Sequence, residues 1–406
     1  MTTTHAPELR DWLRAHARPI TGTRQDQRGA DLAPLTDSIA TGQVVGLGES
    51  TRFSAQTYGI RDRIFRNLVR DHGFRALALQ DTARAGERLD DYVTGGAATA
   101  EQVVAGMWRP WRSAELVDTL TWLRAFNRDH PDDPVRIFGI NPTRAEPSDY
   151  DAVLDYVRRA APEVLDAVAA HLDPIRTAHQ IDEHVQRHQG IHPGRPFADH
   201  ARDAVGLLVG LPATAARETA LTHARLIQEF HEGSVAGRGS FTTDEQPAVT
   251  GILDRLRDTG ARIAYWDGIA HTAAAAFRLG GGEEESHDLG SRLRAALGAG
   301  YVSIGIGFHH GDFGFTAVPA PAPDLVDALL ATVDLPAHYV DLRTAAPELV
   351  RDWRDAPAAV RVISGVYDPA EDDTARVSFG SLAAAFDVLV HVREATSVRW
   401  LPAAEF

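Results

Sequence analysis

Neither cysteine nor lysine occurs among the 406 residues of the chain. Without cysteine, disulfide bonds, thiol nucleophiles and cysteine-ligated metal sites are excluded. The absence of lysine, in contrast, indicates nothing about chemistry; the basic side chains other than histidine are all arginines.

The chain also lacks an excess of positive charge and a long apolar run. Its formal net charge of −15 argues against a nucleic-acid partner, which requires a basic face to neutralise phosphates. The same charge opposes binding to anionic membranes. No stretch of about 18 apolar residues is present, and the N-terminal residues show no basic and apolar leader pattern. We expect a cytoplasmic protein whose partner is a small-molecule substrate.

The hydrophobic pattern predicts an α/β fold. A short apolar run at Val44–Leu47, a helical pattern ending at His72-Gly73 and a second apolar run at 75–80 give the order strand, helix, strand. Such a crossover implies parallel pairing. Further strands are expected at 135–140, 262–266, 301–308, 313–318, 338–342, 360–364 and 386–392. We predict a central, mostly parallel sheet flanked by helices.

The pattern between Tyr150 and Phe230 is helical and contains no convincing strand. We therefore predict an α/β core in two parts, residues 1–148 and 238–406. The intervening residues, 149–237, are predicted to form a helical insertion that makes one wall of a cleft.

Four predicted strands end in polar residues: Glu49, Gln80-Asp81, Asn141 and the stretch Asp267–His271. The carboxyl ends of parallel strands meet at one edge of a sheet, where ligands commonly bind. Each residue alone also has a structural interpretation, for example a helix cap or a solvated carboxylate. Their common position at one edge favours a binding pocket there.

The histidines allow several interpretations. His271 could be a general acid or base, or it could cap the helix that follows it. His309 and His310 are adjacent, so on a strand at most one would face the pocket. His184, His188 and His192 have the i, i+4 spacing of metal ligands, but glycine and proline interrupt that helix and no HExxH pattern is present. No metal site is therefore predicted, and no nucleotide-binding or serine-esterase motif occurs in a supporting context.

In these segments the chain resembles the erythromycin esterase family. Leu47-Gly48-Glu49-Ser50-Thr51-Arg52 matches that family's Leu-Gly-Glu-x-x-His motif, and Ala78-Leu79-Gln80 matches its second strand. Trp111 to Glu115 fits a Trp-x-x-x-Glu segment, and Trp266 to His271 fits a Trp-x-His-Asn-x-His stretch. The resemblance implies metal-independent attack of water on a macrolactone ester, with a histidine as general base and no cofactor.

This chain departs from the family pattern at the positions that matter for that reaction. Arg52 replaces the motif histidine and Gly268 replaces the first histidine of the later pair. Three carboxylates of the pattern are amides here, namely Gln56, Gln80 and Asn141. Because arginine has no acceptor lone pair, Arg52 cannot take a proton from water. The loss of a positioned base typically costs about 10²–10⁴-fold in rate.

The main hypothesis is an erythromycin-esterase-like enzyme that acts on a polyketide- or lactone-type molecule in natural-product biosynthesis without hydrolysis, by cyclisation, elimination or isomerisation. One alternative is an ester or lactone hydrolase that uses His271 with Glu49 or Asp267. Another is a non-catalytic binding or self-resistance protein. The candidate catalytic residues are Glu49, His271, Asp267 and Glu115. The candidate substrate-binding residues are Arg52, Arg61, Gln56, Gln80, Trp108, Trp111, His309 and His310.

Overall fold

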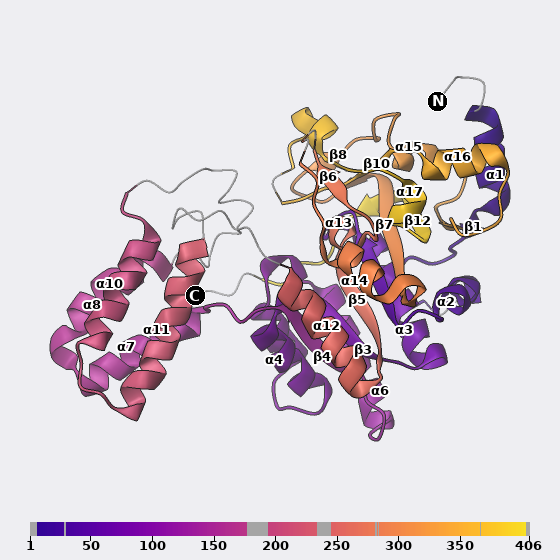
Figure 1. Cartoon of the computed structure of the whole chain (residues 1–406). Helices are drawn as coiled ribbons and strands as arrows, with labels where there is room; N and C mark the ends of the chain where they lie inside the picture. The colour runs from indigo at the N-terminus through magenta and orange to yellow at the C-terminus, as the bar shows by residue number, and fades with distance from the viewer. Residues whose placement is uncertain are drawn as a thin grey trace. The chain divides into compact units, whose positions relative to one another are not determined.

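The computed structural model describes residues 6–27, 30–176, 194–233, 245–280, 282, 284–365 and 367–402. The chain divides into two compact units (Figure 1). The first contains Met1–Pro142 and Glu245–Phe406, and the second contains Thr143–Asp244. The histidine series at 184, 188 and 192 lies outside the described residues. No helix in the described ranges is long and apolar enough to cross a membrane.

The first unit is built on a nine-stranded sheet with the order β1-β9-β12-β7-β2-β5-β3-β4, with β8 paired to β7. Its six parallel strands are β2 (Val44–Glu49), β3 (Phe74–Thr82), β4 (Arg136–Asn141), β5 (Arg262–Gly268), β7 (Tyr301–Asp312) and β12 (Val388–Thr396). Antiparallel strands complete one side: β1 (Arg18–Pro19), β8 (Ala317–Val318) and β9 (Ala337–Asp341). The predicted α/β class and mostly parallel central sheet are confirmed.

Two faces of the sheet are covered by different helices. The helices of the first unit are α1 (Ala6–His16), α2 (Ala33–Ile39), α3 (Ala55–His72), α4 (Ala83–Val93), α5 (Ala100–Ala105), α6 (Ala114–Asp129), α12 (Gln246–Thr259), α13 (Ile269–Thr272), α14 (Leu289–Leu297), α15 (Val326–Leu330), α16 (Glu348–Asp355) and α17 (Leu382–Ala385). Val45 and Leu47 pack in the cluster that contains α3 and α6, whereas Val44 packs with α12 and α14. Successive side chains along a strand point to opposite faces of the sheet. One face is therefore packed against α3 and is called the α3 face, and the other is packed against α12 and is called the α12 face.

Helix α3 carries the residues closest to the strand ends, and its bounds follow from local chemistry. The side chain of Ser54 caps its N-terminus by accepting a hydrogen bond from the backbone N–H of Thr57. Gly73 ends it with a φ of 65°, a left-handed conformation that glycine adopts without strain. The predicted end of this helix is confirmed.

Strand β7 corrects one prediction. The pattern indicated strands at 301–308 and 313–318, on either side of the histidine pair. Instead β7 runs from Tyr301 to Asp312 and contains both histidines, and the second strand is only Ala317–Val318. The reason is β12, which pairs with β7 in parallel as far as Thr396 opposite Asp312. The backbone of this stretch is bonded to a neighbouring strand, so the turn forms later, at Gly314.

A small antiparallel sheet has the order β10-β11-β6. Its members are β10 (Ala358–Arg361), β11 (Arg376–Phe379) and β6 (Phe277–Leu279). The strand expected at 360–364 overlaps β10, whereas the pattern missed β11 and β6. Strands of three or four residues carry too little periodicity to be recognised.

The second unit is helical in its described part, with α7 (Pro147–Ala160), α8 (Leu165–Arg176), α10 (Phe197–Val209) and α11 (Ala215–Gly233). These helices enclose a hydrophobic core of their own. Within it the Tyr150 hydroxyl lies 2.7 Å from Nε2 of the buried His231. The predicted insertion, residues 149–237, falls within this unit, and its role as a cleft wall stays a prediction.

Two buried histidines lie directly opposite each other on β9 and β12. His338 and His391 are 0% and 1% exposed, and their ring centroids are 5.4 Å apart. Burial lowers the pKa of His338 to about 4, and the nearby Arg393 adds to this effect. The folded protein therefore binds this proton much less readily than the unfolded chain, whose histidine pKa is about 6.5.

We predict that acid destabilises the sheet unit through His338. Its contribution to stability is complete above pH 6.5 and is lost as pH falls towards about 4. Between pH of about 7 and about 4.5, the free energy of unfolding should fall by about 2 to 3 kcal/mol more in the wild type than in His338→Leu. Urea denaturation at both pH values measures this difference. A control variant at the exposed His130 should follow the wild type; equal pH dependence of His338→Leu and wild type would contradict the prediction.

Candidate active site at the carboxyl edge of the sheet

The pairing of neighbouring strands places several residues predicted from the sequence side by side at one level of the sheet. Gly48 of β2 lies opposite Asp267 of β5, and Glu49 lies opposite Gly268. Leu79 of β3 lies opposite Trp266, so Gln80 follows at the level of Asp267. The side chain of Glu49 points to the α3 face, because it shares the alternation of Val45 and Leu47. Asp267 shares the alternation of Tyr265, on the α12 face.

A buried ion pair lies under this edge. The Arg61 side chain, on α3, is fully buried, and its NH1 lies 2.7 Å from Oε1 of Glu49, which is 2% exposed. The Arg61 guanidinium also lies over the rings of Trp266 and Tyr58, at 4.4 and 4.7 Å from their centroids. Burial raises the pKa of Glu49, and the guanidinium groups of Arg61 and Arg52 oppose that rise.

Arg52 lies across the strand ends and is held from several sides. Its NH2 donates a hydrogen bond to Oδ1 of Asp267 at 2.9 Å and another to the side-chain oxygen of Gln80. Its guanidinium carbon is 4.9 Å from the ring centroids of both Trp108 and Trp111. The side chain is only 13% exposed. An arginine fixed in this way can orient an oxygen atom but cannot accept a proton.

The partners of Arg52 are themselves fixed. Oδ2 of Asp267 accepts a hydrogen bond from the Tyr265 hydroxyl at 2.6 Å, and Oδ1 accepts one from the backbone N–H of Gly268. Trp111 donates its indole N–H to the backbone oxygen of Gln80 at 2.9 Å. Trp108 donates its backbone N–H to Asp81. The Arg52 position is therefore rigidly built rather than a loose surface contact.

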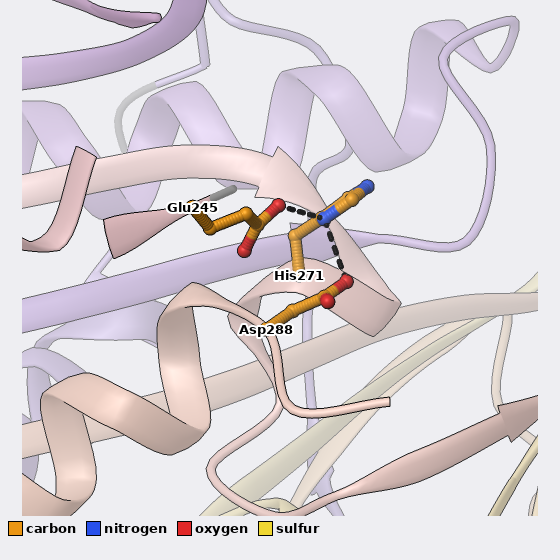
Figure 2. A group of neighbouring side chains, drawn as sticks. All are labelled: Glu245, His271 and Asp288. Carbon is orange, nitrogen blue, oxygen red and sulfur yellow. Dashed lines mark hydrogen bonds and ion pairs between the residues drawn. The ribbon is translucent and has the colours of Figure 1, made fainter. Parts of the chain in front are cut away.

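His271 lies in the short helix α13, which begins directly after β5. Its Nδ1 lies 3.1 Å from Oε1 of Glu245 and 3.0 Å from Oδ2 of Asp288, and its second ring nitrogen points away from both (Figure 2). The side chain is 33% exposed. Burial alone would lower the pKa of His271, but the charge of Asp267 and the hydrogen bonds to Asp288 and Glu245 raise it well above its ordinary value.

Gly268 separates His271 from Arg52. A Cβ atom added at this glycine would lie 3.6 Å from Cδ2 of His271 and 3.8 Å from NH2 of Arg52. Both are ordinary contact distances, and the backbone here is extended, with φ −68° and ψ 154°. The absent side chain therefore leaves space between an imidazole and a guanidinium.

Two of the predicted site residues lie elsewhere. Glu115, in the first turn of α6, accepts hydrogen bonds at 3.0 Å from the backbone N–H and from Nε of Arg399. Gln56 bonds through its amide to the backbone N–H and the hydroxyl of Thr396. These contacts link α3 to the end of β12 and α6 to the chain after it. None of them joins the Arg52 group, which is Arg52 with Gln80, Asp267, Trp108 and Trp111.

The histidine pair also lies apart from Arg52. His309 and His310 are three and four residues beyond Ile306, which lies opposite Glu49, so they sit about 10–13 Å further along the strand direction. Adjacent residues on a strand are expected to point to opposite faces, but the Nδ1 atoms of His309 and His310 are 2.9 Å apart. Burial and the neighbouring His310 lower the pKa of His309.

Sequence reasoning missed Glu245 and Asp288. They lie 26 and 17 positions from His271, and each directly precedes a helix, a position where a carboxylate usually only caps. Among the described residues these two and His271 form the group of three donors whose ligand atoms all lie within 4.8 Å of one another. This group could hold a divalent cation, although a proton on Nδ1 already satisfies both carboxylates.

A separate cavity of about 570 Å³ lies along the C-terminal half of α3 and shares no lining residue with the Arg52 group. Its lining is formed by Gln25, Asp26, Gln27, Ala30, Arg63, Arg66, Asn67, Arg70, Asp71 and Trp122. Arg63 and Arg66 are paired there with Asp31 and Asp62. The Arg52 group, in contrast, is identified by its charges and hydrogen bonds and not by a cavity.

The family model described as erythromycin esterase matches residues 69–395, which is most of the chain. The chain belongs to the erythromycin esterase family. The matched range includes Gln80, Asp267 and His271. It starts within α3, after Glu49, Arg52 and Arg61.

A curated relative agrees with this membership, and solved structures share the fold. Erythromycin esterase type II from Escherichia coli is 25% identical over 175 residues, which cover 42% of this chain and 41% of that protein. The match thus spans about two fifths of the relative's length. A crystal structure of a Bacillus cereus protein has a TM-score of 0.64 at 18% identity, covering 98% of this chain and 99% of that one. A histidine variant of the erythromycin esterase EreC has a TM-score of 0.55 at 16% identity, covering 94% and 98%.

A double-mutant cycle tests the buried ion pair. Arg61→Met leaves the Glu49 carboxylate buried without its closest cation, so the free energy of unfolding should fall by about 3–5 kcal/mol. Combining it with Glu49→Leu should recover part of that loss. The exposed pair of Arg14 with Asp11 is the control, and Arg14→Ala should cost less than about 1 kcal/mol. Urea denaturation measures the free energy of unfolding of each variant. Equal losses for Arg61→Met and Arg14→Ala would contradict a structural role for the Arg61–Glu49 pair.

Proposed function

We propose that this erythromycin-esterase-family protein is a cytoplasmic enzyme that transforms a polyketide- or lactone-type small molecule by acid–base catalysis without hydrolysis. The reaction class is cyclisation, elimination or isomerisation. The observation that carries the proposal is Arg52, which occupies the position of the family's motif histidine and is held by Asp267, Gln80 and two tryptophans.

A hydrolase of this family needs a base to remove a proton from water, and Arg52 at the motif position cannot supply one. The guanidinium has no lone pair to accept a proton. Glu49 is buried and paired with Arg61, and Gln80 is an amide that accepts a hydrogen bond from Arg52. The shape of the site is thus kept while the groups that would transfer a proton to or from water are replaced.

The remaining groups suit a reaction that moves one proton on an oriented substrate. His271 is a partly exposed acid–base group beside Arg52, and its second nitrogen points away from its carboxylate partners (Figure 2). In this proposal Arg52 orients a carbonyl or carboxylate oxygen and His271 moves the proton. Trp108 and Trp111 form a wall for the carbon skeleton. Cyclisations, eliminations and isomerisations depend on such orientation and a single proton carrier.

The substrate class comes from the family. Its name and that of the Escherichia coli relative refer to erythromycin, a macrolactone, so a lactone or a related polyketide is the first chemistry to test. A net charge of −15 is consistent with a small-molecule partner rather than nucleic acid or an anionic membrane.

A product assay tests the proposal. The purified chain is incubated with erythromycin and with δ-valerolactone, and the products are resolved by liquid chromatography and mass spectrometry. No product heavier by one water is expected from the wild type. Hydrolysis that His271→Ala abolishes would instead identify a hydrolase. Tight binding of a polyketide that is always recovered unchanged would identify a non-catalytic binding protein.

Restoring the family residues should create hydrolysis. The variant Arg52→His with Gly268→His and Gln80→Glu regains a base that can activate water, so lactone opening should rise by about 10²-fold or more over the wild type. Gln56→Glu is the matched control, because it restores a family carboxylate outside the Arg52 group and should give no gain. A wild type that already opens the lactone as fast as the restored variant would contradict the proposal.

A further inference from the structure

Three side chains from separate elements meet at one nitrogen atom (Figure 2). His271 comes from α13, Glu245 directly precedes α12, and Asp288 directly precedes α14. The two carboxylates approach the same Nδ1, at 3.1 and 3.0 Å. Both distances lie within the range of N–H···O hydrogen bonds. A single proton on Nδ1 therefore serves two acceptors.

The positions of both carboxylates are set by the ends of helices. Oε2 of Glu245 accepts the backbone N–H of Leu289, the first residue of α14, at 2.5 Å. The Glu245 carboxylate thus contacts both His271 and the start of α14. Helix N-termini carry partial positive charge, which favours a carboxylate at this position. This contact fixes the position of the Glu245 acceptor.

The surroundings of the imidazole are mainly acidic. Glu245 faces it from α12, Asp288 from the start of α14 and Asp267 from β5. The nearest cation across Gly268 is Arg52, which is already bound to Asp267. Two direct partners and one neighbouring carboxylate favour the doubly protonated ring over the neutral one.

We propose that Glu245 and Asp288 are positioning residues that hold the Nδ1–H of His271 and turn its Nε2–H towards a substrate oxygen beside Gly268. The proton on Nε2 passes to a carbonyl or leaving-group oxygen, and the bond electrons stay on nitrogen as its lone pair. Nδ1–H remains bound to the carboxylates throughout. A proton released by the substrate carbon in the same turnover restores Nε2–H, so no other reagent is consumed. The orientation of His271 does not depend on the proposed function, whereas the role of Nε2 rests on it.

The space beside Gly268 is part of this inference. A larger residue there would place atoms between Cδ2 of His271 and NH2 of Arg52, where the substrate oxygen is expected. Because an added Cβ meets no atom closer than 3.6 Å, Gly268→Ala should fold normally. It should raise KM or lower kcat of the non-hydrolytic reaction without changing the titration of His271.

Nuclear magnetic resonance of the histidine rings tests the positioning directly and without a substrate. The full-length protein, labelled with nitrogen-15 in histidine and kept in EDTA, is titrated as wild type, Glu245→Gln, Asp288→Asn and the double variant. The wild-type His271 pKa should lie above that of free histidine, each single variant should lower it, and the double variant should lower it most. Glu348→Gln, which removes a carboxylate from the first turn of α16, is the matched control and should leave it unchanged.

Three results would overturn the inference. One is a wild-type His271 that titrates like free histidine, and another is a double variant that titrates like the wild type while its circular dichroism shows a folded chain. The third is a His271 signal that added Zn²⁺ shifts at stoichiometric concentration and EDTA restores, since Nδ1 would then be a metal ligand. A positive titration result combined with no turnover of any lactone would leave the positioning intact and remove only the proposed function.

Activity gives the second readout once a substrate is in hand. Loss of a positioning carboxylate should lower kcat at neutral pH, with little change in KM. The pH at which kcat falls as His271 loses its proton should also become lower. Glu348→Gln should have neither effect. An unchanged pH profile in Glu245→Gln and Asp288→Asn would show that the two carboxylates serve only the fold.

Discussion

The buried ion pair between Arg61 and Glu49 is the constraint on which the rest of this edge depends. A guanidinium with no exposed surface needs an anion and polarisable neighbours, and Glu49, Trp266 and Tyr58 supply them. This pair fixes the end of β2 against α3. Arg52 can then cross from the end of β2 to Asp267 on the next strand and Gln80 on the one after it.

Within this frame, side chains that depart from the family's sequence pattern are held by hydrogen bonds. Gln80 keeps an acceptor oxygen for Arg52, and Asp267 accepts hydrogen bonds from Arg52, Tyr265 and Gly268. In our proposal, proton transfer moves from the motif position to His271 on the neighbouring strand end. Glu245 and Asp288, which lie outside the family motif, contact that histidine. The proposed non-hydrolytic reaction rests on this change of proton carrier.

The sequence predicted the parts of the fold that depend on local patterns. Alternating apolar residues and the crossover after β2 were sufficient for the parallel sheet, and the strand-end rule brought Glu49, Gln80 and Asp267 to one edge. The pairing of His271 could not be predicted, because no local pattern connects it with Glu245 or Asp288. The positions of Glu115 and Gln56 depend on the chain after β12, whose path across α3 and α6 has no sequence signature. The length of β7 likewise depends on its partner β12.

The central claim is that this site moves a proton on its substrate and does not add water to it. Incubation with erythromycin in oxygen-18-labelled water, followed by mass spectrometry of every product, tests this most directly. The account predicts that products carry no label and that unreacted macrolactone is recovered with its ester intact. One labelled oxygen in a newly formed carboxylate, dependent on His271, would show that the chain is a hydrolase and contradict the account.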